Sequence, residues 1–417
     1  MGTTTLRTMA AAALTMLLAG GAHASDPLAE ILSQSGRDLW DGQYDVTAAD
    51  GERAASVATT RPIFSAATLA ATERAVIDYR AIVAGGGWPV VPAGQRLRLG
   101  ANAPAVALLR RRLIVSGDLP TRAGISNQFD TYVDRAVKRF QARHGLPADG
   151  VLGPHSYAAL NVPAGVRLRQ LEINAKRLRE QERPFDRFVM VNIPGAEIEA
   201  VENGRVAQRH TAVVGRISRP TPILTSRIEE LNLNPYWNAP ESIVRRDIIP
   251  LMRKNPKYLQ ENNIRIYGPD KQELDPRFID WSTDEAANYH FKQDPSKINA
   301  MRAAKINFPN RHAVYMHDTP EQGLFDKLVR FESSGCVRVK NIRDLLTWLA
   351  KDTPGWSRRS LERTIAAGQR TDARLASPVG VHFTYVTAWS TGPGVVQFRD
   401  DIYKLDAEPE LTLATSG

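Results

Sequence analysis

The spacing of apolar residues changes near Phe188, and this change constrains the fold more than any other feature of the sequence. Before it, apolar residues recur at three- and four-residue intervals, which is typical of amphipathic helices. The helical segments predicted in this way are residues 67–84, 104–115, 131–144, 154–160 and 166–183. From Phe188 onward, apolar residues such as Val189 and Val191 alternate with others, which predicts strands. Helices followed by strands predict an α+β fold with a mainly-β second part.

Turn residues and changes in composition divide the chain further. We expect a helical scaffold at 25–95, a compact three-helix unit at 96–163, a linking basic helix at 164–186, a mainly-β domain at 187–406 and a disordered tail at 407–417. Glycine and proline interrupt helices, and both occur in the segment 85–89. This segment ends the last helix of the scaffold before the three-helix unit begins.

Several features of the mainly-β domain are expected from local patterns. Asn203-Gly204 between alternating runs predicts a hairpin. Further strands are expected at 313–316, 381–388 and 395–403. The long polar stretch 241–300, with one helix at 242–255, is typical of a lid or binding loop. Asn341 and Asp344 resemble a capping box at the start of a helix over 342–351.

Residues 1–24 have the pattern of a secretory signal peptide. A single positive charge at Arg7 is followed by a short apolar stretch, and the segment ends in Ala22-His23-Ala24. The apolar stretch is short for a membrane span, and no other segment is apolar enough for one. We therefore expect an exported protein that begins near Ser25 without a transmembrane segment; a retained anchor is the alternative.

The charge balance favours anionic partners. The chain has 54 Lys and Arg against 45 Asp and Glu, a formal net charge of +9. Nucleic acid, a membrane surface or a polymer rich in carboxylates would suit this charge. Because no nucleic-acid-binding motif accompanies it, we expect no nucleic-acid partner.

Cys336 is the only cysteine in the chain. Cysteines of exported proteins normally pair as disulfides, so an unpaired one is either a buried structural thiol or a reactive thiol. Ser334 and Gly335 precede it and allow a tight turn in which backbone N–H groups approach a developing oxyanion. His317 lies at the end of an apolar run and is a candidate base, and Arg338 adds positive potential.

The other histidines are weaker candidates for the general base. His312 is a competing base, but it precedes the apolar run and is expected at the far end of that strand. His144, His155, His210 and His382 lack a thiol or carboxylate partner at suitable spacing and are interpreted as structural.

The three-helix unit carries a specific resemblance. Its segment 136–161, AVKRFQARHGLPADGVLGPHSYAALN, resembles the peptidoglycan-binding domain found in many bacterial wall enzymes. The resemblance implies a muropeptide or glycan ligand, and a helical spacer is the alternative. The basic helix that follows is expected to present a solvated face or to rest against an anionic wall.

The region around Cys336 resembles the catalytic signature of L,D-transpeptidases of the YkuD type. The matching pieces are YMHDTP at 315–320 and SSGCVR at 333–338. The whole chain resembles the YcbB-like branch of this family, through segments at 86–89, 191–194, 234–240, 307–310 and 397–403.

This resemblance implies a set of catalytic roles. Cys336 would attack the carbonyl of a meso-diaminopimelate residue in a donor tetrapeptide and release D-alanine. His317 would act as general base and acid, held by the backbone carbonyl of Asp318, and the backbone of Gly335 would help to form the oxyanion hole. Asp318 and Arg302 stand where glycine is expected in relatives.

The resemblance also implies the surroundings of the site. Tyr315, Ser334, Arg338 and Trp237 would line the substrate cleft, under a capping loop at 241–300. The implied partners are peptidoglycan stem peptides and glycan, with outer-membrane proteins as further acceptors. No metal or cofactor is implied, carbapenems would acylate the cysteine, and the compartment would be the periplasm of a Gram-negative cell.

Two other classes of function remain open from the sequence. The first is a wall-directed cysteine peptidase, although peptidases of the NlpC type place cysteine before histidine and here His317 comes first. The second is a non-catalytic peptidoglycan-binding scaffold, which would not need both Cys336 and His317.

Overall fold

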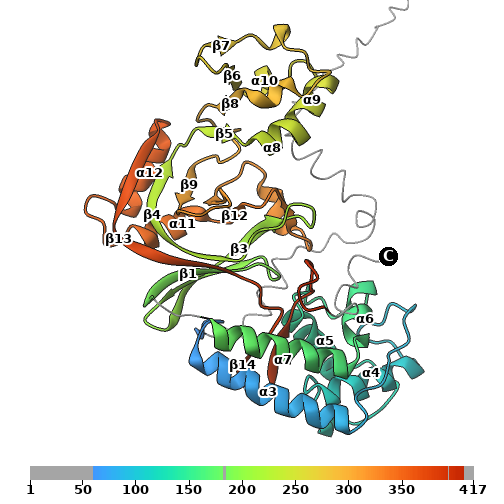
Figure 1. Cartoon of the computed structure of the whole chain (residues 1–417). Coiled ribbons are helices and arrows are strands. Elements are labelled where there is room, and N and C mark those ends of the chain that lie inside the picture. Colours follow the sequence, from blue (N-terminus) through green and yellow to red (C-terminus); the bar gives the residue numbers. More distant parts are fainter. Residues whose placement is uncertain (1–59, 182–184, 393, 408–417) are drawn as a thin grey trace, which may run out of the picture.

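The computed structural model describes residues 60–181, 185–392 and 394–407. The predicted signal peptide, the first part of the predicted scaffold and nearly all of the predicted tail lie outside these residues. The described part has an α+β architecture, with helices gathered at one end and a large sheet above them (Figure 1). No helix among the described residues combines the length and apolar character that crossing a membrane requires.

All five helices predicted before Phe188 are present. They are α3 (Ala66–Ala84), α4 (Pro104–Val115), α5 (Thr131–Arg143), α6 (Pro154–Asn161) and α7 (Ala164–Glu180). Their starts follow local rules. Asp130 accepts hydrogen bonds from two N–H groups of the first turn of α5, and α4 and α6 begin with proline.

The helices α4, α5 and α6 enclose a hydrophobic core of their own, which includes Leu109, Leu113 and Phe140. This unit is also fixed to the rest of the molecule. Arg143 donates to the backbone carbonyl of Val396 at 3.1 Å, and the ring of His144 stacks on Phe398 with centroids 5.3 Å apart. The three-helix unit is therefore docked on the C-terminal strands rather than tethered to them.

The scaffold consists of two long helices and a C-terminal hairpin. The helices α3 and α7 run side by side (Figure 1) and pack against the hairpin of β14 (Ala388–Gly392) and β15 (Val395–Phe398). The predicted closing strand at 395–403 thus ends at Phe398. The segment after it leaves the hairpin and returns along α7.

The part of the chain after Phe188 is built on a nine-stranded sheet. Its strands in spatial order are β11 (Phe331–Ser333), β3 (Arg205–Gly215), β12 (Val337–Val339), β10 (Met316–His317), β9 (Ala304–Asn307), β4 (Leu224–Leu233), β13 (Thr371–Thr384), β1 (Arg187–Asn192) and β2 (Glu197–Glu202). A further pairing between β2 and β3 closes the sheet on itself.

The closed sheet surrounds the main hydrophobic core. Two helices that follow β12 contribute to this core, α11 (Ile342–Leu349) and α12 (Arg358–Ala367). The predicted capping box at the start of α11 is wrong: Asn341 has a left-handed backbone with φ of 54°, and its side chain makes no capping bond. The sequence interpretation did not include α12.

The stretch 241–300 folds into a subdomain rather than a polar loop. A four-stranded sheet in the order β5 (Trp237–Ala239), β8 (His290–Gln293), β6 (Ile264–Tyr267) and β7 (Glu273–Leu274) packs on a continuous helical segment. That segment comprises α8 (Glu241–Ile243), a π-helical turn (Val244–Ile248) and α9 (Ile249–Lys254), and α10 (Tyr258–Glu261) follows it. Strands of two to four residues are too short to show alternation clearly, which explains why the sequence did not reveal them.

This capping subdomain, residues 237–303, has its own hydrophobic core and extends away from the large sheet (Figure 1). The remaining short helical turns are Thr121–Ala123, Pro276–Phe278, Glu285–Asn288 and Gln322–Asp326.

Candidate active site

The strands β10 and β12 place the predicted catalytic residues on one face of the sheet. They run parallel, with Met316 opposite Val337 and His317 opposite Arg338. Met316 and Val337 are fully buried in the main core. Because side chains alternate along a strand, Tyr315, His317 and Arg338 project from the opposite face. Cys336 directly precedes β12 and its side chain interacts with the hydroxyl of Tyr315.

The surroundings of Cys336 keep its thiol neutral. Burial raises the pKa of Cys336 above its ordinary value. The backbone N–H of Tyr315, the ammonium group of Lys305 and the hydroxyl of Tyr315 act in the opposite direction, because each favours the thiolate. These groups are therefore placed to stabilise negative charge on sulfur when it forms.

His317 is held in the orientation that a general base requires. Its Nδ1 donates to the backbone carbonyl of Asp318 at 2.5 Å. A carbonyl oxygen can only accept, so in the neutral ring Nδ1 carries the proton and Nε2 carries the lone pair. Burial, followed by the charge of Arg338, lowers the pKa of His317 to about 3. The imidazole is therefore neutral at pH 7.

The two catalytic candidates thus form a neutral pair rather than a thiolate and an imidazolium. The free energy of desolvation opposes charge on either group.

The side chain of Asp318 connects the histidine to the capping subdomain. Its carboxylate accepts from the N–H groups of Thr319 at 2.8 Å and Ala303 at 3.3 Å. Arg302 lies 4.0 Å from it, with φ of 44°. The two residues noted as departures from the family pattern are therefore neighbours, at the point where the subdomain returns to β9.

The loop before the cysteine depends on glycine. Gly335 has φ of 111°, a conformation that residues with a Cβ rarely adopt. Its N–H donates to Ser333 Oγ at 3.1 Å, and Ser333 Oγ donates to the carbonyl of Cys336. The carbonyl of Gly335 accepts a hydrogen bond from Thr221 Oγ1 at 2.9 Å. The oxyanion role of the Gly335 backbone stays a prediction, since this N–H is directed to Ser333.

Three of the predicted substrate-binding residues have hydrogen-bond or ion-pair partners within the protein. Trp237 is buried in the capping subdomain and hydrogen-bonds to the hydroxyl of Tyr315, so this pair joins the subdomain to the sheet. Ser334 accepts from Arg219 at 2.9 Å. Arg338 pairs with Glu321 at 2.7 Å, and both side chains are largely buried. A fork between Arg338 and a substrate carboxylate stays a prediction, and it would compete with Glu321.

Comparisons with known proteins identify the families of two parts of the chain. Residues 186–356 match the YkuD family, described as "L,D-transpeptidase catalytic domain", and this match contains Cys336 and His317. The chain carries an L,D-transpeptidase catalytic domain. Residues 102–160 match the family described as "Putative peptidoglycan binding domain". The three-helix unit is therefore a peptidoglycan-binding domain of this family.

One curated relative is named "Putative L,D-transpeptidase" and comes from Haemophilus influenzae. It is 34% identical over 244 residues, which cover 58% of this chain and 49% of the relative. The chain therefore spans about half the length of the curated relative it matches.

Among solved structures, an L,D-transpeptidase from Xylanimonas cellulosilytica is 17% identical with a TM-score of 0.22, covering 70% of this chain and 99% of that one. An L,D-transpeptidase from Stackebrandtia nassauensis is 14% identical with a TM-score of 0.26, covering 73% and 98%.

Several residues near the Cys336 loop of the L,D-transpeptidase domain were not identified from the sequence. Arg219 bonds to Ser334 and also pairs with Asp247 of the capping subdomain at 2.6 Å. Two guanidinium nitrogens of Arg216 are buried without a partner among the described residues. Lys305 lies opposite His317 on β9, with Nζ 4.5 Å from the ring centroid of Tyr315. No local pattern marks these residues, because their environment is created by distant strands.

Three of the other histidines have surroundings of their own. His312 is exposed beside Arg311. His210 contacts the carbonyl of Lys340, and His382 packs among the rings of Phe64, Phe185 and Phe188. Among the residues that the structure describes, no cluster of three or more histidine, cysteine and acidic side chains is arranged to hold a metal ion.

Buried neutral histidines predict that the folded chain loses stability in acid. Burial lowers the pKa of His144 well below its ordinary value, that of His382 to about 4 and that of His317 to about 3. The unfolded chain protonates these residues near pH 6.5, whereas the folded chain does not. The stability that they contribute is therefore present above pH 6.5 and is lost as the pH falls, by about 1.4 kcal/mol per pH unit for each histidine.

Denaturant unfolding between pH 7.5 and pH 5 measures this loss. His382→Phe removes one titrating group from an aromatic site and is expected to make the decrease shallower. His312→Gln, at an exposed position, should leave the slope unchanged. An equal slope in His382→Phe and the original chain would contradict the prediction.

Proposed function

We propose that this chain is an L,D-transpeptidase that forms 3→3 cross-links in peptidoglycan. The carrying observation is that β10 and β12 pair in parallel with His317 opposite Arg338, so that a neutral His317, held through Nδ1, lies on the neighbouring strand to the segment that Cys336 begins, within the matched catalytic domain. The donor is a tetrapeptide stem, whose third residue, meso-diaminopimelate, is transferred, and the leaving group is D-alanine.

The first half-reaction makes a thioester. The sulfur of Cys336 attacks the carbonyl carbon of the third residue while His317 Nε2 takes the thiol proton. A C–S bond forms, and the carbonyl oxygen becomes an oxyanion that nearby backbone N–H groups stabilise. When this intermediate collapses, the C–N bond to D-alanine breaks, and His317 returns the proton to the leaving amine.

The second half-reaction resolves the thioester. An acceptor amine attacks the same carbon, and His317 takes a proton from the amine. The C–S bond breaks, an amide forms, and the thiolate of Cys336 recovers the proton. The acceptor is the side-chain amine of a second stem peptide, a free D-amino acid or an amine of an outer-membrane protein.

The peptidoglycan-binding domain supports a wall substrate and a periplasmic location. It is docked on β15 through Arg143 and His144, so a bound glycan would have a defined position relative to the catalytic domain. The net charge of +9 suits a polymer rich in carboxylates. Export through the signal peptide at 1–24 would bring the chain to this polymer.

Incubation with purified tetrapeptide muropeptides tests the proposal. Mass spectrometry should show release of D-alanine, a stem-peptide adduct on Cys336 and 3→3 linked dimers. Shortened stems without dimers would favour a cysteine peptidase. Binding to sacculi without adduct or turnover would favour a non-catalytic scaffold. A carbapenem should also leave a mass adduct on Cys336.

The neutral pair predicts an unusual pH profile for acylation. With the pKa of His317 lowered to about 3 and that of Cys336 raised above its ordinary value, neither group changes charge between pH 5 and pH 7.5. We expect kcat/KM for acylation to be nearly constant over this range, without an acidic limb near pH 6.5. A decrease of kcat/KM in acid with an apparent pKa near 6.5 would contradict the neutral pair. Alkylation of Cys336 by iodoacetamide, which needs the thiolate, should rise only in alkaline solution.

A further inference from the structure

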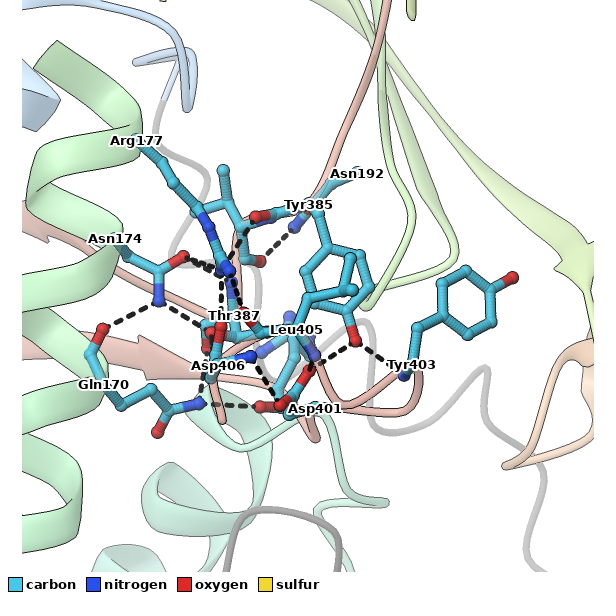
Figure 2. Close-up of polar contacts among 12 residues, drawn as sticks. Gln170, Asn174, Arg177, Asn192, Tyr385, Thr387, Asp401, Tyr403, Leu405 and Asp406 are labelled. Carbon is cyan, nitrogen blue, oxygen red and sulfur yellow. Dashed lines mark hydrogen bonds and ion pairs between the residues drawn. The ribbon is translucent and has the colours of Figure 1, made fainter. Parts of the chain in front are cut away.

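The C-terminal segment after β15 lies in a buried polar network between α7 and the catalytic sheet (Figure 2). Asp406 pairs with Arg177 of α7 and accepts from Thr387 Oγ1. Asp401 accepts from the hydroxyl of Tyr385 at 2.7 Å and from the N–H of Asp406 at 2.7 Å. The network holds this segment tightly, because each carboxylate has several donors.

Tyr403 connects this network to the loop that follows β3. Its N–H donates to the hydroxyl of Tyr385 at 2.8 Å, and the two rings stack with centroids 5.7 Å apart (Figure 2). Its own hydroxyl donates to the carbonyl of Gly215 and accepts from the N–H of Thr221 at 3.1 Å. Burial raises the pKa of Tyr403 to about 12, so the hydroxyl keeps its proton at neutral pH.

Thr221 carries the connection to the nucleophile loop. Its Oγ1 accepts from the N–H of Gly215 at 2.8 Å and donates to the carbonyl of Gly335 at 2.9 Å. The side chain is almost fully buried. Tyr403 therefore holds the loop after β3 at the carbonyl of Gly215 and the N–H of Thr221. Thr221 in turn joins this loop to Gly335 through its hydroxyl.

The bond to Gly335 has a geometric consequence at Cys336. The carbonyl of Gly335 and the N–H of Cys336 belong to one planar trans peptide, so they point in opposite directions. Whatever fixes this carbonyl also fixes the direction of the Cys336 N–H. That N–H belongs to the residue whose sulfur would attack, and backbone N–H groups next to a nucleophile commonly donate to an oxyanion formed on the attacked carbonyl.

We propose that Tyr403 and Thr221 are positioning residues that orient the Cys336 N–H toward the oxyanion of acyl transfer. The proposal rests on the acyl transfer of the proposed function and assigns a catalytic purpose to the C-terminal segment. The bonds run in series, from Tyr385 to Tyr403, to Thr221, to Gly335. Removing either hydroxyl should loosen the same peptide.

Two probes of Cys336 separate this effect from general damage to the site. Acylation by p-nitrophenyl acetate passes through an oxyanion, whereas alkylation by iodoacetamide does not. Tyr403→Phe keeps the stacked ring and should slow acylation roughly 10- to 100-fold, while the alkylation rate changes less than about twofold. Tyr157→Phe is the matched control, since its hydroxyl donates to the carbonyl of Gln95 in the peptidoglycan-binding domain.

Variants of Thr221 test the series arrangement. Thr221→Val should reduce acylation about as much as Tyr403→Phe, and Thr221→Ser should restore it. The double variant Tyr403→Phe with Thr221→Val should lose little more than either single variant, because both act on one peptide.

The proposal is overturned if Tyr403→Phe acylates at the original rate, if acylation and alkylation fall together, or if the losses in the double variant multiply. Tetrapeptide turnover by the original chain is measured in parallel. Its absence would refute the proposed function alone, since the acetate probe reports on the oxyanion donor without peptidoglycan.

Discussion

Replacement of Cys336 by alanine is expected to abolish the stem-peptide adduct and the 3→3 linked products together. Cys336 is the only cysteine of the chain, so no second thiol can substitute for it. Loss of a covalent nucleophile typically reduces turnover by roughly 10⁴-fold or more. The sulfur also contributes little to folding, because it lies at the margin of the main core.

Mass spectrometry of the protein and of the muropeptide products measures both effects in one reaction. Binding to sacculi and the denaturant midpoint of the alanine variant serve as controls and should remain close to those of the original chain. Continued cross-linking by the variant would exclude Cys336 as the nucleophile, and a different residue of the same face would then have to be sought.

Replacement of His317 by alanine is expected to slow acylation by about 10²- to 10⁴-fold, the usual contribution of a positioned general base. The thiol of Cys336 is neutral, so without the imidazole no group accepts its proton during attack. The nearby cations Lys305 and Arg338 cannot replace the base, because their charged forms only donate.

His312→Ala is the matched control, because this histidine is exposed and lies shortly before the same strand. It should acylate at the original rate. Single-turnover measurement with a tetrapeptide donor separates acylation from later steps. A variant of His317 that acylates normally, or a loss of similar size in His312→Ala, would show that the base is elsewhere.

Cys336 and His317 could be named as catalytic candidates from the sequence because the local signals around them are strong. Cys336 follows two small residues, and the glycine among them has the left-handed backbone that a tight turn requires. His317 ends an apolar run, but the predicted strand at 313–316 is wrong over most of its length, because β10 covers only Met316–His317. The carbonyl of Asp318 holds the histidine in the way the resemblance implies.

The role of Arg338 illustrates what local sequence does not contain. Its position after the cysteine suggested a free guanidinium for a substrate carboxylate, yet Glu321 pairs with it at 2.7 Å. Glu321 lies 17 positions before Arg338, directly ahead of the turn Gln322–Asp326. Such a pairing depends on the path of a loop, and no spacing rule predicts that path.

The capping subdomain illustrates the same limit at a larger scale. Its strands have two to four residues each, and their apolar side chains are buried only because four strands and the neighbouring helices assemble around them. Trp237 was named as a cleft residue, and its burial beside the hydroxyl of Tyr315 follows from this assembly.

The order of residues along the chain is enough to predict the helical and strand-rich halves, the peptidoglycan-binding pattern and the candidate pair Cys336 and His317, because each depends on periodicity or on residues close together in the chain. The neutral state of these two side chains, and the contact of Tyr403 with Thr221 across 182 positions of the chain, follow only from the folded structure. Burial and electrostatic environment are sums over atoms from distant elements, so they exist only after the sheet has closed and the C-terminal segment has returned to α7.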